Sequence, residues 1–140
     1  MNAEHKIKRQ VLISLMSKND IADHGGFDLN TIDGIDDAYD QAGEYEGVFD
    51  FVEIIDEMED FRCGGRSTNL KGSEYSRCYE SERVAVELDD GAFVSWVYWT
   101  GGGKHGEPGA IDWIDDAIFV DCEKKQELVT TYAFSLKNDD

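Results

Sequence analysis

Carboxylate side chains crowd one part of this chain, between residues 20 and 60. That stretch holds fifteen Asp and Glu residues and no Lys or Arg, in a chain of 140 residues with a formal net charge of −18. A surface of one charge sign attracts the opposite sign and repels its own. The stretch therefore predicts a surface that binds a basic protein partner, and it argues against direct binding of nucleic acid.

The acids recur at helical spacing, since side chains three and four positions apart lie on one side of a helix. At about 1.5 Å of rise per residue, neighbouring charges in such a row stand roughly 5–6 Å apart. The candidate partner-binding residues are Asp33, Asp36, Asp37, Asp40 and Glu44 in a first row and Asp50, Glu53, Glu57 and Asp60 in a second. The alternative is a solvated helix face. The lack of any base over 41 residues favours a binding face.

A glycine-rich loop offers a second candidate. Residues 101–106 read Gly-Gly-Gly-Lys-His-Gly and match the GxGxxG pattern of dinucleotide sites. Such a site also needs a helix N-terminus inside a βαβ unit, and here Pro108 and Gly109 follow instead. Either the loop only joins two strands, or Lys104 and His105 hold an anion while Asp112 or Asp115 does acid–base work. The second reading predicts a small-molecule-binding protein or enzyme with its site at residues 100–116.

The His and Cys residues show no local motif for metal binding or thiol chemistry. Three histidines and three cysteines are scattered without the spacing of metal ligands: His5, His24 and His105, and Cys63, Cys78 and Cys122. Two stretches within residues 28–44 approach a calcium-binding loop but lack its glycine or its acids at the required positions. We predict no cofactor, no metal site and no catalytic residue.

Three amphipathic helices are predicted to carry the acidic rows, over residues 3–17, 31–43 and 47–61. Their inward residues recur at i, i+3, i+4 and i+7. They are Ile7, Val11, Leu12 and Leu15; then Ile32, Ile35, Tyr39 and Ala42; then Val48, Phe51, Val52, Ile55 and Met58. The first helix also carries Lys6, Lys8 and Arg9, which attract either the acidic helices within the fold, the role we expect, or an acidic partner.

The second half of the chain changes to the period of two that marks β-strands. Strands are predicted at residues 74–88 and 92–99 around an Asp89-Asp90-Gly91 turn, and at 117–122 and 127–136 around residues 123–126. Both faces of 92–99 are largely apolar, which places that strand in the centre of the sheet. The prediction is a single α+β domain, residues 1–140, with an antiparallel sheet of about four strands and the N-terminal helices on one face.

Two further patterns bear on location. No apolar run approaches the roughly 20 residues that a membrane-spanning helix needs. The N-terminus, Met1 to Lys6, has no apolar stretch of the kind found in secretory leaders. We therefore expect a cytoplasmic protein with reduced thiols and no membrane partner.

In its size, its base-free acidic helices at residues 30–61 and the sheet behind them, the chain resembles small acidic phage-encoded anti-defence proteins. These are the anti-restriction and anti-CRISPR DNA mimics. The resemblance is one of layout, so no family residue can be carried over. It implies an inhibitor, not an enzyme, that blocks the nucleic-acid-binding surface of a bacterial defence complex in the host cytoplasm. An acidic accessory or immunity-type protein that covers a basic toxin or ribosomal surface is a further reading.

Overall fold

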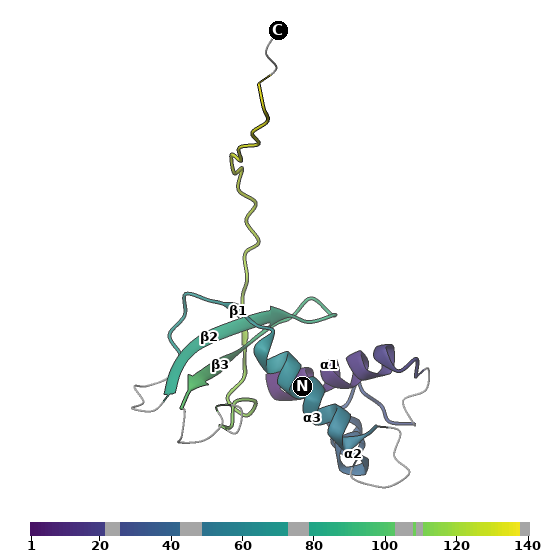
Figure 1. Ribbon diagram of the computed structural model, residues 1–140. Coiled ribbons are helices and arrows are strands. Elements are labelled where there is room, and N and C mark those ends of the chain that lie inside the picture. Colours follow the sequence, from purple (N-terminus) through teal and green to yellow (C-terminus); the bar gives the residue numbers. More distant parts are fainter. Residues whose placement is uncertain (22–25, 43–48, 73–78, 103–107, 109–110, 138–140) are drawn as a thin grey trace.

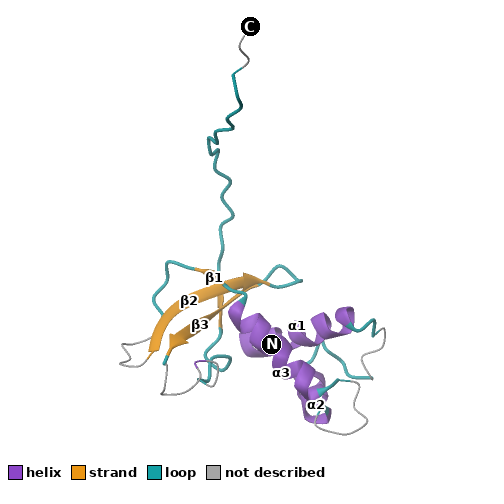
Figure 2. Cartoon of the chain, in the orientation of Figure 1, coloured by secondary structure: helices purple, strands orange, loops and turns teal. Residues whose placement is uncertain are grey.

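The computed structural model describes residues 1–21, 26–42, 49–72, 79–102, 108 and 111–137. Within these residues the chain forms helices α1 (Ala3–Lys18), α2 (Ile32–Gln41) and α3 (Phe51–Cys63) and strands β1 (Arg66–Ser67), β2 (Tyr79–Glu87), β3 (Phe93–Gly101) and β4 (Ile118–Val120). The helices group beside the sheet, and the C-terminal segment runs away from both (Figures 1 and 2). The predicted α+β class with an antiparallel sheet is confirmed.

Helix α1 forms as predicted. The Asn2 side-chain oxygen caps it by accepting the His5 backbone N–H at 2.9 Å. The predicted inward residues are all buried: Ile7, Val11, Leu12 and Leu15. Its lysines are used within the molecule, since Lys6 pairs with Asp90, Lys8 with Glu4 and Lys18 with Glu57. Lys6 and Lys8 are therefore engaged within the molecule, but with Asp90 and Glu4 and not with the acidic helices as expected; the base that pairs with α3 is Lys18.

Helix α2 begins at a cap and depends on a close backbone contact. The Thr31 hydroxyl accepts the Gly34 backbone N–H at 3.0 Å. A Cβ atom on Gly34 would lie 2.0 Å from the Asp28 carbonyl oxygen, so the backbone here admits glycine alone. Ile35 and Ala42 are buried as predicted, but the prediction for Ile32 is wrong, because it sits in the exposed first turn.

Helix α3 is rotated from its predicted orientation. Phe51, Val52 and Ile55 were expected to face inward, yet they are 56%, 63% and 50% exposed. The Asp50 side chain caps the helix by accepting the backbone N–H groups of Val52 and Glu53. This cap places Phe49 just before the helix and Ile54 four residues inside it, where the two pack as a hydrophobic staple. The staple turns Ile54 inward, and the predicted stripe turns outward.

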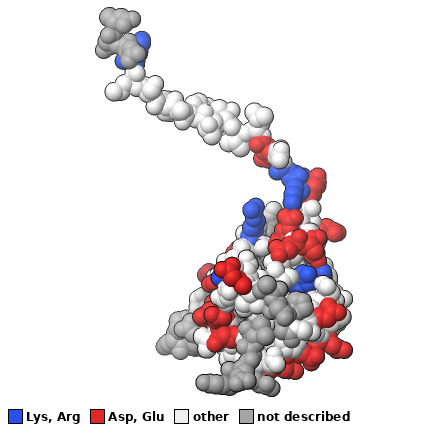
Figure 3. Space-filling view, turned by 90° about the vertical axis from the view of Figure 1, so that its right-hand side faces the viewer, with Lys and Arg blue, Asp and Glu red and all other residues white. Residues whose placement is uncertain are grey.

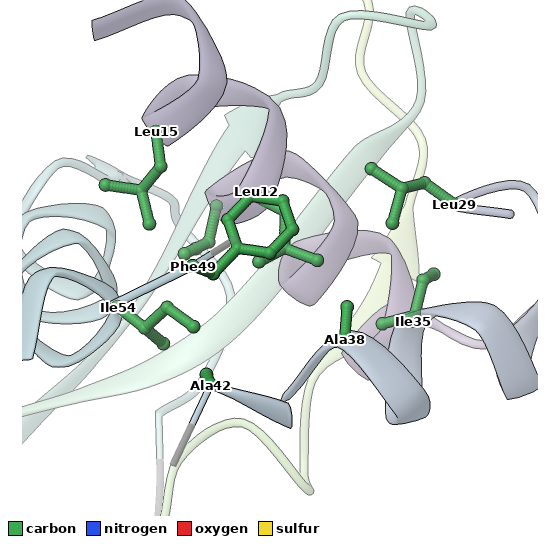
Figure 4. Packing of buried hydrophobic residues seen from close by; sticks show 9 residues of the cluster. Leu12, Leu15, Leu29, Ile35, Ala38, Ala42, Phe49 and Ile54 are labelled. Atoms are coloured by element: carbon green, nitrogen blue, oxygen red, sulfur yellow. The ribbon is translucent and has the colours of Figure 1, made fainter. Parts of the chain in front are cut away.

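Two clusters of buried side chains form the core. The first lies between the three helices and contains Phe49, which sits beside Leu12 and Ile54 (Figure 4). The second lies between the sheet, the start of α1 and the 111–117 segment, around Trp96. Met58 and Phe61 of α3 pack against both clusters, so α3 joins the helical part to the sheet.

Arg62 makes the polar connection between α3 and β3. Its guanidinium donates to both Glu59 carboxylate oxygens, at 3.0 and 2.6 Å, and to the Trp99 carbonyl at 3.2 Å. The Trp96 indole N–H donates in return to the Arg62 carbonyl at 3.2 Å. The hydrogen bonds that the Arg62 guanidinium donates to the Glu59 carboxylate lower the pKa of Glu59 below its ordinary value.

The sheet has the order β1-β2-β3-β4, and every neighbouring pair is antiparallel. The predicted turn joins β2 to β3: Gly91 has a φ of +87° and the Asp90 carboxylate accepts the Ala92 N–H. Residues 94–97 of β3 are all buried. Because successive strand residues point to opposite faces, both faces of β3 are covered, and its predicted central position is confirmed.

The predicted strand at residues 127–136 and its hairpin at 123–126 are wrong. Residues 121–137 form no strand, and β1 is the fourth strand of the described sheet instead. Residues 123–126 read Glu-Lys-Lys-Gln and contain none of the Gly, Asn, Asp or Pro residues that favour tight turns. Lys124 also pairs with Glu87 and lies over the Phe93 ring, which holds this segment against β2 and β3 instead of letting it reverse.

Candidate partner-binding surface

The α2 acids form a row that faces solvent. Asp33, Asp37 and Asp40 follow i, i+4, i+7 and are exposed. Within the described part of the chain, none of the three forms an ion pair. Like charges at this spacing destabilise a helix by a few tenths of a kcal/mol per pair. The row therefore costs the fold some stability and leaves its charge available to a partner.

Asp36 lies at the edge of this row and contacts α1. Its carboxylate is 2.9 Å from His5 Nε2, while His5 Nδ1 lies 2.7 Å from the Asn2 side-chain oxygen. That Asn2 oxygen also accepts the His5 backbone N–H, so it acts as an acceptor. Both ring nitrogens thus lie within hydrogen-bond distance of side-chain oxygens. Asp36 is therefore partly engaged within the molecule.

The acidic row on α3 is placed differently. Asp50 caps the helix, and Glu53 accepts a hydrogen bond from the Asn19 side chain at 3.1 Å. Glu57 is only 14% exposed and accepts from Lys18, whose pKa this hydrogen bond raises. Asp60 is exposed and adds to the negative field at Lys18. The α3 row thus faces the end of α1, and much of it is engaged there.

The exposed face of α3 instead combines apolar side chains with acids. Phe51, Val52 and Ile55 lie there with the exposed Asp56 and Glu59. A groove of about 460 Å³ separates this face from α2, with Tyr39 on the α2 side and Ile55 on the α3 side. Lys8 also lines the groove, 5.5 Å from the centre of the Tyr39 ring.

Burial raises the pKa of Tyr39 well above its ordinary value, so its hydroxyl remains protonated at physiological pH. That hydroxyl donates to the Lys8 carbonyl at 3.0 Å. The groove therefore has a neutral aromatic side chain from α2 on one side and the acids Asp56 and Glu59 of α3 on the other. We call the exposed side chains of this region the α2–α3 surface; they are Asp33, Asp37, Asp40, Phe51, Val52, Ile55 and Asp56.

The distribution of charge over the molecule agrees with this description. Figure 3 shows acids spread over the body of the molecule, while the middle of the C-terminal segment, where it stands clear of the body, is white. Apolar side chains at the centre of a patch with charged groups at its rim are typical of protein–protein interfaces. The acidic rim favours a basic partner, and long basic side chains can also lay their aliphatic stems on apolar surface.

Sequence reasoning found the acids of this surface but assigned its apolar residues to the core. The signal that would have corrected this is local: Asp50 followed by Glu53 at the third helical position is a capping pattern, flanked by Phe49 and Ile54. This capping pattern indicates that α3 begins after Asp50 and that the side of the helix bearing Ile54 is buried.

The remaining candidate residues do not form a site in the described part of the chain. Glu44, Lys104 and His105 lie outside the described residues. Asp112 and Asp115 are exposed, and a hydrogen bond with Asp115 raises the pKa of Asp112. Trp113 between them is buried against Trp96, with ring centres 5.6 Å apart. Trp113 therefore packs inward from a polar edge.

No three His, Cys, Asp or Glu side chains among the described residues are grouped to hold a metal ion. No described helix has the length and apolar character to cross a membrane.

No protein-family model, curated protein or solved structure matches this chain.

Proposed function

We propose that this chain is an acidic protein inhibitor that docks its α2–α3 surface on the basic, nucleic-acid-binding surface of a partner protein. The observation that carries the proposal is the exposed row of Asp33, Asp37 and Asp40, which is unpaired among the described residues. An inhibitor of this type occupies Lys and Arg side chains that otherwise contact phosphate. The partner's nucleic acid is then excluded by competition.

The surface supports this mode of binding in two ways. Its carboxylates would give fast, steered association that weakens as salt rises, because exposed charges are screened within about 8 Å at physiological ionic strength. Its apolar residues Phe51, Val52 and Ile55 would supply contact area that does not depend on salt. The complex is therefore expected to weaken with salt without being abolished by it, unlike one that depends on charge alone.

The test uses charge reversal on α2. The triple variant Asp33→Lys, Asp37→Lys, Asp40→Lys is immobilised beside the wild-type chain and exposed to bacterial lysate at low and high salt. The wild type is expected to capture a protein that binds DNA or RNA, and free wild-type chain is expected to displace the nucleic acid from it. The α2 variant is expected to do neither, because its row would repel the partner's bases.

A charge-matched control separates this surface from the overall charge of the protein. The variant Glu80→Lys, Asp89→Lys, Asp116→Lys changes three exposed acids outside the α2–α3 surface by the same total charge. It should keep capture and displacement. Equal loss in both variants would leave only a net-charge effect. Capture that survives α2 reversal would rule the surface out, and so would a captured partner that keeps its nucleic acid.

A further inference from the structure

Two stretches of nine or more residues in this chain contain no Asp, Glu, Lys or Arg. One is residues 91–103, which includes the central strand β3, and the other is residues 128–136. The second reads Leu-Val-Thr-Thr-Tyr-Ala-Phe-Ser-Leu, without Gly or Pro, and it is rich in β-branched and aromatic residues. This composition is typical of a buried strand.

The C-terminal segment nevertheless contacts nothing along this stretch. Leu128 is fully exposed, and Phe134 and Leu136 are 91% and 96% exposed. Tyr132 and Phe134 stack on each other, with ring centres 6.3 Å apart, as side chains on one side of an extended chain. Unpaired strands of this kind are templates for pairing with another chain.

The segment does not return to its own sheet. It passes residues 123–126 without reversing and continues away from the body (Figure 1). Two such segments paired only with each other would form a two-stranded ribbon, which is marginally stable in water. The apolar side chains therefore need a packed surface on another molecule.

This chain carries a matching surface at the root of the segment. A groove of about 800 Å³ lies over the sheet face away from the helices, where Ala85 and Phe93 line it. Its walls are the 66–70 segment with the half-exposed Leu70, and residues 120–124. Apolar side chains line this groove together with charged ones of both signs, among them Arg66, Glu87 and Lys124. A second copy thus offers apolar contacts to the segment.

We propose that residues 128–136 of one copy lie as a β-strand in this groove of a second copy, which returns the exchange to form a two-fold symmetric dimer. The contact uses the uncharged stretch of one copy and the sheet face of the other that lies away from the helices, so two chains of net charge −18 meet away from their acidic helices. Reciprocal use of one segment and one groove is the isologous arrangement of a two-fold dimer. The proposal is independent of the inhibitor function.

The first test measures mass by light scattering over a range of concentrations. The full chain should show twice the mass of one chain. The variant Tyr132→Lys, Phe134→Lys should show the mass of one chain, because it removes the two aromatic rings that would contact the apolar side chains of the groove. The control Phe51→Lys, Val52→Lys removes two exposed apolar residues of α3 and adds the same charge; it should remain a dimer.

The second test uses complementation. Ala85→Arg fills the groove and should give a monomer with unchanged circular dichroism; if it fails to fold, Leu70→Lys at the groove wall replaces it. Mixing this groove variant with the segment variant restores one intact segment and one intact groove. A mixed dimer should therefore form, although neither variant dimerises alone.

Four results would overturn the proposal. They are a full chain that stays monomeric at every concentration, a groove variant that stays dimeric, a mixture that stays monomeric, and an α3 control that dissociates as the segment variant does. A monomer whose 128–136 amides are protected from hydrogen exchange would show that the strand folds on its own sheet instead. A monomer with unprotected amides would leave the segment to a different partner.

Discussion

Strand β3 and the C-terminal stretch 128–136 are alike in sequence and opposite in structure. Both are uncharged, apolar and rich in residues that favour strands. Residues 94–97 of β3 are buried on both faces, whereas residues 128–136 are exposed throughout. The comparison teaches that strand-forming composition is a preference, which becomes a strand where neighbouring backbone and a packing surface are supplied.

What β3 has and the C-terminal stretch lacks is a set of partners. Strand β2 pairs with β3 along all nine residues, and β4 pairs with its first three. On the helix face, Phe61 and Trp113 surround Trp96, with ring centres 5.1 and 5.6 Å away. The C-terminal stretch receives none of these: all of residues 128–136 are exposed and form no strand.

The largest expected effect comes from removing the centre of β3's packing. Trp96→Ala leaves a cavity among Phe61 and Trp113 and loses the hydrogen bond to the Arg62 carbonyl. It should lower the free energy of unfolding by about 3–5 kcal/mol, measured by urea titration. Trp99→Ala on the same strand is the control, since Trp99 is only half-buried and contacts Tyr79. If Trp96→Ala and Trp99→Ala lowered the free energy of unfolding equally, the stability of β3 would not depend on the packing around Trp96.

A smaller effect tests the polar link that ties α3 to β3. Glu59→Gln weakens the partner of Arg62, and because the Glu59 carboxylate is 49% exposed it should cost no more than about 1 kcal/mol near neutral pH. Since the pKa of Glu59 is lowered in the fold, its contribution is present above the ordinary value of 4.5 and disappears as pH falls through the folded pKa.

The gap in unfolding free energy between wild type and Glu59→Gln should therefore close in acid. Urea titrations at about pH 7 and about pH 3 measure it. Asp56→Asn is the control on the same helix, because Asp56 is exposed and has no ion pair among the described residues. A gap that widens in acid would contradict the role given to the Glu59–Arg62 pair.

The smallest effect is expected in the C-terminal stretch. Phe134→Ala should change the free energy of unfolding of the dilute, monomeric chain by less than about 0.5 kcal/mol, because the ring contacts Tyr132 and no part of the body. Thermal unfolding at low protein concentration checks this. A loss comparable to that of Trp96→Ala would mean that the stretch is buried on its own molecule, and the contrast with β3 would vanish.

The sequence predicted more of the helices than of the sheet. Helix α1 and its inward residues follow from one unambiguous apolar stripe, and Thr31 could be recognised as the α2 cap. Helix α3 offered two stripes, one through Phe51 and Ile55 and one through Ile54 and Phe61. Periodicity alone does not choose between them. The Asp50 cap and the packing of Phe49 on Leu12 made the choice.

Some properties of the α2–α3 surface could likewise be predicted from the sequence, and others could not. The exposure of Asp33, Asp37 and Asp40 could be read from their spacing opposite Ile35 and Ala38. The engagement of Glu57 by Lys18 could not, because it depends on where the end of α1 meets α3. The exposed apolar residues of α3 also went unrecognised, since their composition suits a core as well as an interface.

By itself, the sequence determined which segments become helices, where the chain turns at Asp90-Gly91, and where negative charge accumulates. Capping, periodicity and charge act over a few residues, so a local pattern suffices. Only the tertiary structure decided which of two uncharged stretches is buried, which side of α3 faces solvent, and which acids are paired. Each of these depends on contacts between segments far apart in the chain, and their competition for the same surfaces is settled only when the whole molecule packs.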